Sequence, residues 1–175
     1  MKVVIISGSP RKNGNTQIMM KYVLEYVKQK DADVKFINLA EDGFESYRGD
    51  PSEINYNEKI LQAARDVTEA DVWLIGAPIY NSMFSSALKN LFEFISYKET
   101  EGKTAGLAII AGGMIGFTDM QTLLTQLMSY FRVITNPIAV YVTAEKIEGD
   151  QIISDEVISR LNELVDRTFS MVKSN

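Results

Sequence analysis

The segment that follows the first apolar run is rich in groups that bind anions. Residues 8–16 read Gly-Ser-Pro-Arg-Lys-Asn-Gly-Asn-Thr and separate a β-type run from a helical pattern. The backbone N–H groups and the dipole at the start of the following helix attract negative charge. Ser9, Asn15 and Thr16 add short polar side chains. The guanidinium of Arg11 suits phosphate oxygens. This loop therefore predicts a site for a monophosphate.

The spacing within this loop excludes two common nucleotide-binding motifs. Gly8 and Gly14 have five residues between them, and Asn15-Thr16 stands where a Walker A loop requires Lys-Ser/Thr. The loop does not fit the dinucleotide pattern GxGxxG either. For any single residue, the alternative is that it only turns the chain or caps the helix. For the whole loop, with Arg11 included, we favour phosphate binding.

A second loop, over residues 76–82, reads Gly-Ala-Pro-Ile-Tyr-Asn-Ser and follows another buried run. Pro78 stiffens the exit from the sheet. Tyr80 can lie against the face or edge of a planar ligand whose polar rim bonds the backbone amides. The alternative is a proline-stiffened turn in which Ser82 or a neighbour caps the next helix and Tyr80 is ordinary cover.

A third loop, over residues 111–116, reads Ala-Gly-Gly-Met-Ile-Gly. Its paired glycines allow the backbone to approach a ligand closely, although they also suit a plain tight turn. Taken together, the three loops predict one elongated site with a phosphate at one end and a ring at the other. A cofactor shaped like a mononucleotide fits that description.

Composition excludes much of the usual catalytic chemistry. The 175 residues include no cysteine and no histidine, which excludes disulfides, thiolate nucleophiles, Cys/His metal sites and histidine-based triads. The net charge of -5 argues against a nucleic-acid partner. No apolar run reaches the roughly 20 residues that span a bilayer, and the first residues read as a strand. We expect a cytoplasmic protein without a membrane partner.

Short apolar runs alternate with helical patterns along the chain, and this alternation predicts the fold. The expected strands cover residues 3–6, 34–39, 72–75, 107–110 and 133–142. The expected helices cover residues 16–28, 53–69, 85–97, 118–130 and 154–172. This order predicts an α/β fold, a flavodoxin-like three-layer sandwich with a five-stranded parallel sheet in the order 2-1-3-4-5. One domain over residues 1–175 is expected, with the three loops at the carboxyl ends of strands.

Three motifs resemble those of the NAD(P)H-dependent FMN reductase family. They are Gly-Ser-Pro-Arg-x-x-Gly-Asn-Thr from Gly8, Pro-Ile-Tyr-Asn from Pro78 with a following Leu-Lys-Asn, and Ala-Gly-Gly from Ala111. The resemblance runs in order through nearly the whole chain. It implies bound FMN, a homodimer or homotetramer, and hydride transfer from NADPH or NADH to a flavin, quinone, azo dye or similar small acceptor. No catalytic acid or base and no metal site is assigned, because the cofactor supplies the chemistry.

The resemblance also implies which residues bind the cofactor. The residues expected at the FMN phosphate are Ser9, Arg11, Asn15, Thr16 and Gln17. Those expected to border the isoalloxazine ring are Pro78, Ile79, Tyr80, Asn81 and Ser82, with Ala111, Gly112 and Gly113 completing the ring pocket. Many relatives have Pro-Gly where this chain has Ser85-Ser86, which leaves the nicotinamide or acceptor side less defined. The related iron–sulfur flavoproteins are excluded because they need a cysteine cluster.

Two other classes of protein share features with this sequence, and an interface between copies is also expected. A flavodoxin-like electron carrier without NAD(P)H activity would need the same phosphate loop, and would differ in not being bleached by NAD(P)H. A receiver-like regulatory domain would need an acidic cluster after the first strand, where Gly8-Ser9-Pro10-Arg11 has the wrong charge for Mg²⁺. Surplus apolar surface on two helices suggests an oligomer; these residues are Leu88, Leu91, Phe92, Ile95, Leu123, Leu124, Leu127, Met128 and Phe131. The loop over residues 42–51 either covers a neighbouring subunit's site or is plain surface. We favour plain surface.

Overall fold

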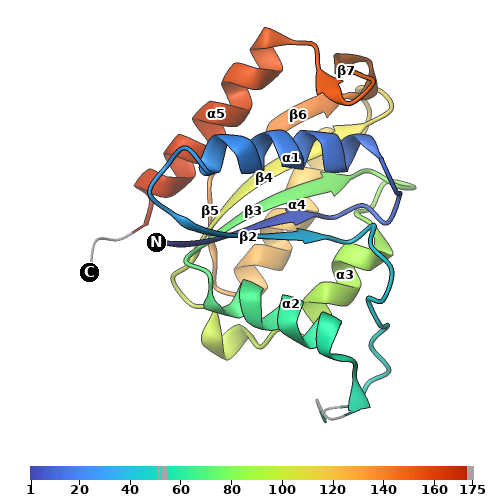
Figure 1. Ribbon diagram of the computed structural model, residues 1–175, viewed down its shortest axis with the longest axis vertical. Helices are drawn as coiled ribbons and strands as arrows, with labels where there is room; N and C mark the ends of the chain where they lie inside the picture. Colours follow the sequence, from blue (N-terminus) through green and yellow to red (C-terminus); the bar gives the residue numbers. More distant parts are fainter. Residues whose placement is uncertain (51, 53–54, 173–175) are drawn as a thin grey trace.

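A parallel sheet covered on both faces forms the centre of the computed structural model, which describes residues 1–50, 52 and 55–172 (Figure 1). The strand order is β2-β1-β3-β4-β5. The bounds are β1 (Lys2–Ser7), β2 (Asp33–Asn38), β3 (Val72–Pro78), β4 (Thr104–Ala111) and β5 (Ile134–Thr135). The expected α/β flavodoxin-like sandwich and its strand order are confirmed.

Helices form the two outer layers (Figure 1). α1 (Asn15–Val27) and α5 (Asp155–Ser170) cover one face of the sheet, and α2 (Glu58–Glu69), α3 (Ser86–Glu93) and α4 (Phe117–Tyr130) cover the other. Along β1, Val3 and Ile5 join the core under α1 and α5, whereas Val4 and Ile6 join the opposite core. Burial on both faces explains why the strands read as continuous apolar runs. No helix in the described part of the chain is long and apolar enough to cross a membrane.

The segment expected as one fifth strand is divided in two. β5 and β6 (Val140–Thr143) each pair parallel with β4, at different places along it. Asn136 separates them: its N–H donates to the Ala105 carbonyl at 2.7 Å, and its side-chain amide donates to Thr168 Oγ1 at 3.1 Å. Pro137 then has no N–H for the ladder, so the chain leaves the sheet before it returns as β6.

Helix ends differ from the expected ones for local reasons. The helix expected over residues 53–69 begins at Glu58, because Asn57 caps it by accepting the Ile60 N–H at 3.2 Å. Residues 53 and 54 lie outside the described residues. The helix expected over 85–97 ends at Glu93, and a short 3-10 helix η2 (Tyr97–Glu99) follows. A second 3-10 helix, η3 (Ala144–Lys146), precedes a small unpredicted hairpin, β7 (Ile147–Glu148) and β8 (Gln151–Ile152).

The apolar stripes of α3 and α4 are mostly used inside the molecule. Seven of the residues expected to supply surplus surface are buried: Leu88, Leu91, Phe92, Ile95, Leu124, Met128 and Phe131. Trp73 of β3 packs against Phe92 and Phe131 and donates its indole N–H to the Val67 carbonyl at 2.8 Å. Leu123 and Leu127 remain half-buried. The sheet therefore accounts for most of these apolar side chains.

Candidate functional site

A cavity of about 130 Å³ lies at the carboxyl edge of β1, β3 and β4. It is lined by Ser9, Arg11, Gly14, Asn15, Thr16, Pro78, Ile79, Tyr80, Ile110, Ala111, Gly112 and Ala144. The three loops expected to share one ligand therefore meet around one space. This is the position that open parallel sheets offer to ligands.

Most of the predicted site residues line this cavity, and four do not. Gln17, Asn81, Ser82 and Gly113 are outside its lining. Gln17 instead accepts the Asn13 N–H at 3.1 Å and so holds the shape of the first loop. Three lining residues were missed by the predicted set, namely Gly14, Ile110 and Ala144. Ile110 lies near the end of β4 and Ala144 follows β6, so the rule that ligands lie beyond strand carboxyl ends could have found them.

Helix capping distinguishes α1, whose first residues line this cavity, and α4 from the other three α-helices. The N-cap residues of α1 and α4 are Gly14 and Gly116, and neither helix has a side-chain cap. Asn57, Ser85 and Ser154 cap α2, α3 and α5 through side-chain oxygens. The first N–H groups of α1 are therefore left to other acceptors, beside Asn15 and Thr16 in the cavity wall. Gly14 of the first loop is thus the N-cap of α1, but no side chain of this loop caps the helix.

Arg11 is the charged residue of the cavity wall, and no carboxylate shares that wall. Within the described part of the chain, each other arginine contacts a carboxylate: these are Arg48, Arg65, Arg132, Arg160 and Arg167. Arg11 has no such partner among the described ion pairs. The neighbouring Lys12 is engaged by Asp42 at 2.8 Å, and this contact lowers the pKa of the Asp42 carboxyl. The cavity thus retains one uncompensated positive charge.

The first loop depends on a close backbone approach at Gly8. Its N–H donates to the Gly76 carbonyl of β3 at 2.8 Å, and a Cβ at Gly8 would lie 2.6 Å from that same oxygen. The Gly8 carbonyl accepts a hydrogen bond from the buried Ser85 hydroxyl, which also accepts the Leu88 N–H at 3.0 Å. Ser85 is thus the N-cap of α3, in place of Ser82.

The second loop contains a tight two-residue hairpin. Tyr80 and Met83 exchange backbone hydrogen bonds of 2.8 and 2.9 Å. Asn81 and Ser82 form the turn with φ values of 48° and 66°, in the left-handed region. Before the turn, Pro78 extends past the last β1–β3 pair, Ser7 with Gly76, so its missing N–H falls where no neighbouring β1 residue needs it.

The side chain of Tyr80 points back to the first loop. Its hydroxyl lies 2.8 Å from Ser9 Oγ, which also accepts the Arg11 N–H at 3.1 Å. Ser9 is only 1% exposed. The second loop therefore contributes a polar group at the end of the cavity where the first loop supplies its donors.

Asn90, from the Leu-Lys-Asn motif, lies outside this cavity and holds the loop between β2 and α2. Its side chain accepts the Tyr47 N–H at 2.8 Å and donates to the Glu45 carbonyl at 2.9 Å. The hydroxyl of Tyr56 accepts the N–H groups of Arg48 and Asp50. The described part of this loop therefore packs on its own chain; Pro51 lies outside the described residues.

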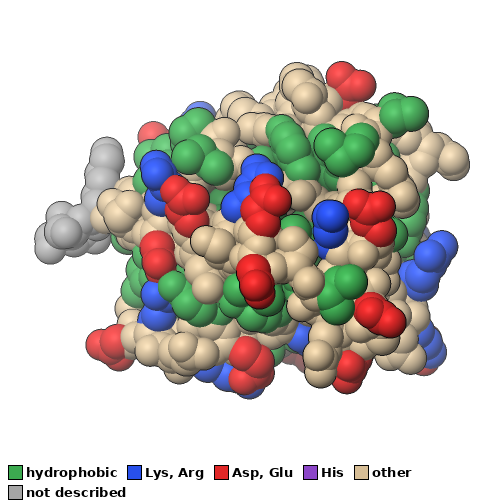
Figure 2. Space-filling model, turned by 90° about the horizontal axis from the view of Figure 1, so that it is seen from above, with side chains coloured by type: hydrophobic (Ala, Val, Ile, Leu, Met, Phe, Trp, Pro, Cys, Tyr) green, Lys and Arg blue, Asp and Glu red, His purple; other side chains and the backbone are tan. Residues whose placement is uncertain are grey.

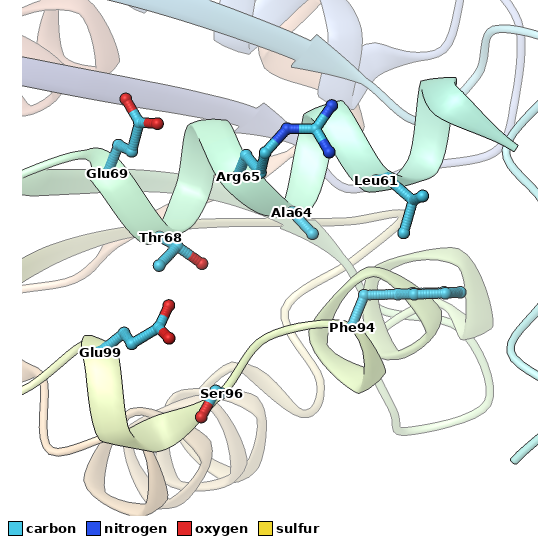
Figure 3. Close-up of a pocket in the computed structure, with 8 residues that line it drawn as sticks. All are labelled: Leu61, Ala64, Arg65, Thr68, Glu69, Phe94, Ser96 and Glu99. Carbon is cyan, nitrogen blue, oxygen red and sulfur yellow. The ribbon is translucent and has the colours of Figure 1, made fainter. Parts of the chain in front are cut away.

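Three larger hollows lie elsewhere on the molecule, and each has carboxylates in its wall. One, of about 250 Å³, lies between α2 and residues 94–99, where Thr68 points toward Glu99 (Figure 3). In its wall, Arg65 is bonded to Glu58, and Glu69 to Lys2. The second, of about 480 Å³, includes Glu41 and Asp42, which pair with Lys59 and Lys12. The third, of about 380 Å³, is lined by Lys21, Glu25 and Asp150 among others. All three therefore mix acidic groups into their walls, unlike the cavity that contains Arg11.

Elsewhere on the described part of the chain, charges of both signs are mixed. The face seen from above carries Lys/Arg and Asp/Glu side chains interspersed (Figure 2). Among the described residues, no cluster of acidic side chains could hold a metal ion. Burial lowers the pKa of Lys103, but this lysine bonds the Ala70 carbonyl at the amino end of the sheet. The cavity of the three loops thus remains the candidate site.

Comparison with known proteins gives consistent results. A family model described as NADPH-dependent FMN reductase matches residues 1–146. The chain is 28% identical over 167 residues to an NAD(P)H-dependent FAD/FMN reductase of Geobacillus thermodenitrificans, covering 94% of this chain and 89% of the relative. It is 26% identical to an FMN-dependent NADPH-azoreductase of Staphylococcus saprophyticus, covering 100% and 97%. The crystal structure of an NADH:FMN oxidoreductase in its apo form has the same fold, with a TM-score of 0.83, 23% identity and coverage of 99% and 91%.

Proposed function

This chain belongs to the NADPH-dependent FMN reductase family, and we propose that the cavity of the three loops is its FMN site. The chain is an oxidoreductase that passes hydride equivalents from NAD(P)H through FMN to a small acceptor such as a flavin, a quinone or an azo compound. The observation that carries the assignment of the site is Arg11, an unpaired cation beside the uncapped start of α1.

The donor set fits the phosphate of FMN. A phosphate brings negative charge and several strong acceptor oxygens. Arg11 supplies the opposite charge, and the N–H groups at the start of α1 supply directional donors. Ser9 and Thr16 are almost fully buried, so their hydroxyls are held in place. These groups bind and orient the cofactor at one end of the cavity.

The part of the cavity wall formed by the second and third loops suits a flat ring. Pro78, Ile79, Ala111 and Gly112 give it apolar walls and accessible backbone. A Cβ at Gly112 would meet nothing within 4 Å, so this stretch of the wall is open. FMN, when bound, supplies the redox chemistry, because its flavin ring accepts hydride and releases electrons. The residues of the wall bind the ring, set its orientation and limit access of water.

We further propose that the chain assembles as a homodimer or homotetramer. Met114 and Ile115, in the loop that supplies Gly112, are 76% and 91% exposed. Such apolar side chains beside a site suit a covering surface from a second copy. Light scattering over a range of concentrations tests this, and a monomer at every concentration would contradict it.

We also propose one FMN-binding domain over residues 1–175 and a cytoplasmic location. The packing of α5 on the same sheet as α1 supports one domain. The absence of cysteine from the sequence supports a compartment where disulfides are rare.

The decisive experiment is an absorption spectrum of the protein with FMN, followed by anaerobic titration with NADPH and then NADH. A perturbed flavin spectrum that bleaches on reduction is expected. Perturbation without bleaching would instead indicate an electron carrier. An unperturbed spectrum would contradict the assignment of the cavity.

A further inference from the structure

The hydroxyl of Tyr80 lies at the end of the cavity assigned to phosphate, although its backbone belongs to the loop expected at the ring. The distance from Tyr80 OH to Ser9 Oγ is 2.8 Å, and the two residues are 71 positions apart in the sequence. The hairpin formed with Met83 fixes the backbone of Tyr80 through two hydrogen bonds. Its hydroxyl is therefore held at the first loop by local structure as well as by Ser9.

A count of donors shows that the Ser9–Tyr80 pair has one hydroxyl proton left for a ligand. Each hydroxyl has one proton and two acceptor positions. One proton makes the Ser9–Tyr80 bond, and the Arg11 N–H occupies an acceptor position on Ser9. Whichever residue donates, the other hydroxyl keeps a proton that has no acceptor among the described residues. Because both residues line the cavity, that proton is available to a ligand oxygen.

The charge of the surroundings favours an anionic acceptor. Arg11 is in the same wall, and no Asp or Glu is among the lining residues. A hydroxyl that donates to a charged oxygen makes a stronger bond than one that donates to a neutral oxygen. The terminal phosphate of FMN provides such oxygens, and the flavin ring does not.

We propose that Tyr80 is a phosphate-binding residue that makes the site prefer FMN to riboflavin, the same flavin without the phosphate. This inference rests on the proposed FMN site. It adds to that site a phosphate-binding residue that comes from the β3–α3 loop. Tyr80 thereby connects the loop beside the ring to the loop that holds the phosphate, and it is a binding residue with no part in proton transfer.

The test compares the dissociation constants of FMN and riboflavin in wild type, Tyr80→Phe and the control Tyr22→Phe. Tyr22 also makes a 2.8 Å side-chain hydrogen bond, to Asn162, and joins α1 to α5 outside the cavity. Tyr80→Phe should weaken FMN about tenfold, the usual effect of losing a hydrogen bond to a charged group, and leave riboflavin within about twofold. Tyr22→Phe should change neither constant.

The outcomes separate this inference from the proposed function. Equal weakening of both flavins by Tyr80→Phe would make Tyr80 a ring contact, and no change in either would remove it from binding; both results would overturn the inference. FMN binding without bleaching by NADPH or NADH would contradict the oxidoreductase while leaving Tyr80 to be judged by the affinities. A wild type that binds neither flavin would overturn both.

A second measurement does not depend on the folding of a Tyr80 variant. Inorganic phosphate added to the Tyr22→Phe protein, without flavin, should perturb the ultraviolet absorption of tyrosine through Tyr80, whose hydroxyl is at the phosphate loop. Sulfate at the same ionic strength should produce a similar effect, whereas chloride should not. An unchanged tyrosine spectrum at saturating phosphate would contradict the inference.

Discussion

The Ser85 hydroxyl donates to the carbonyl of Gly8, so the start of α3 is bonded directly to the loop that follows β1. Ser85 is 2% exposed and simultaneously accepts the Leu88 N–H. In this chain, one buried hydroxyl thus joins the capping of a helix to the position of the phosphate loop.

Replacing Ser85 with alanine should therefore affect both stability and binding. Loss of an N-cap costs about 1 kcal/mol of unfolding free energy, and the unpaired Gly8 carbonyl adds to this loss. FMN affinity should also fall. Ser154→Ala, which removes the N-cap of α5 and lies outside the lining of the cavity, should lower stability alone. Urea unfolding and FMN titration distinguish the two effects, and equal FMN affinity in both variants would contradict the coupling.

Arg11→Gln should weaken FMN by about tenfold to a hundredfold and leave riboflavin binding unchanged, because the guanidinium interacts with the phosphate. Arg11 is exposed and makes no ion pair among the described residues, so the melting temperature without flavin should stay the same. Lys12→Gln is the matched control, since Lys12 is already paired with Asp42. Fluorescence titration with both flavins measures the effect. If Lys12→Gln lost more FMN affinity than Arg11→Gln, Lys12 and not Arg11 would be the residue that binds the phosphate.

Ser82→Gly should stabilise the protein by about 1 kcal/mol, because Ser82 has a φ of 66°, where glycine carries no steric penalty. The exposed helical residue Ser129 provides a contrast, since Ser129→Gly should destabilise by roughly 0.5 kcal/mol. Thermal and chemical unfolding of the apo proteins measure both changes. A destabilised Ser82→Gly variant would show that the serine side chain contributes more than its backbone strain costs.

The rate of reduction of an acceptor should show no titration of a protein side chain between about pH 6.5 and 8.5. The chain lacks histidine and cysteine, the side chains that ordinarily titrate near this range. A steady-state profile with an acceptor that itself does not titrate there is the measurement. A sigmoidal change centred near pH 7 would indicate a proton-transfer group in the protein.

As the pH is lowered, the loop between β2 and α2 should open before the sheet does. Hydrogen bonds from Arg48 and from the Asn57 N–H lower the pKa of Glu45, and bonds from Ser52 N–H and Asn55 lower that of Asp50. Because these folded-state pKa values lie below the unfolded ones, the contribution is present above about pH 4 and is lost as the pH falls through the folded values. Hydrogen exchange at Tyr47 and Arg48 should then rise before exchange in the sheet, and simultaneous loss would contradict this order.

The sequence carried enough information to predict the layers and the three loops. Buried parallel strands must be apolar on both faces, so β1, β3 and β4 can be recognised from the sequence alone. The division of β5 from β6 was missed, because the apolar residues of the segment continue across Pro137 and only the contacts of Asn136 with Ala105 and Thr168 show where the chain leaves the sheet.

Within the site, the sequence predicted which residue types are present, but it did not predict which partners their side chains contact. The composition of the first loop already indicated a bound anion. That Arg11 remains unpaired while Lys12 is engaged depends on Asp42, which approaches only in the folded chain. Likewise, Tyr80 meets Ser9 because Asn81 and Ser82 adopt left-handed backbone conformations that their residue types do not require.

The brevity of β5 has a consequence for how copies of this chain can associate. This margin of the sheet consists of β5, with two residues, and β6, with four, divided by Pro137, so another strand finds only short runs of free backbone groups. At the opposite margin, β2 carries the exposed charges of Asp33 and Lys35. Both margins therefore discourage continuation of the sheet from one molecule into the next. This arrangement opposes fibrous aggregation. Copies of the chain would then associate in a closed assembly through side-chain surfaces.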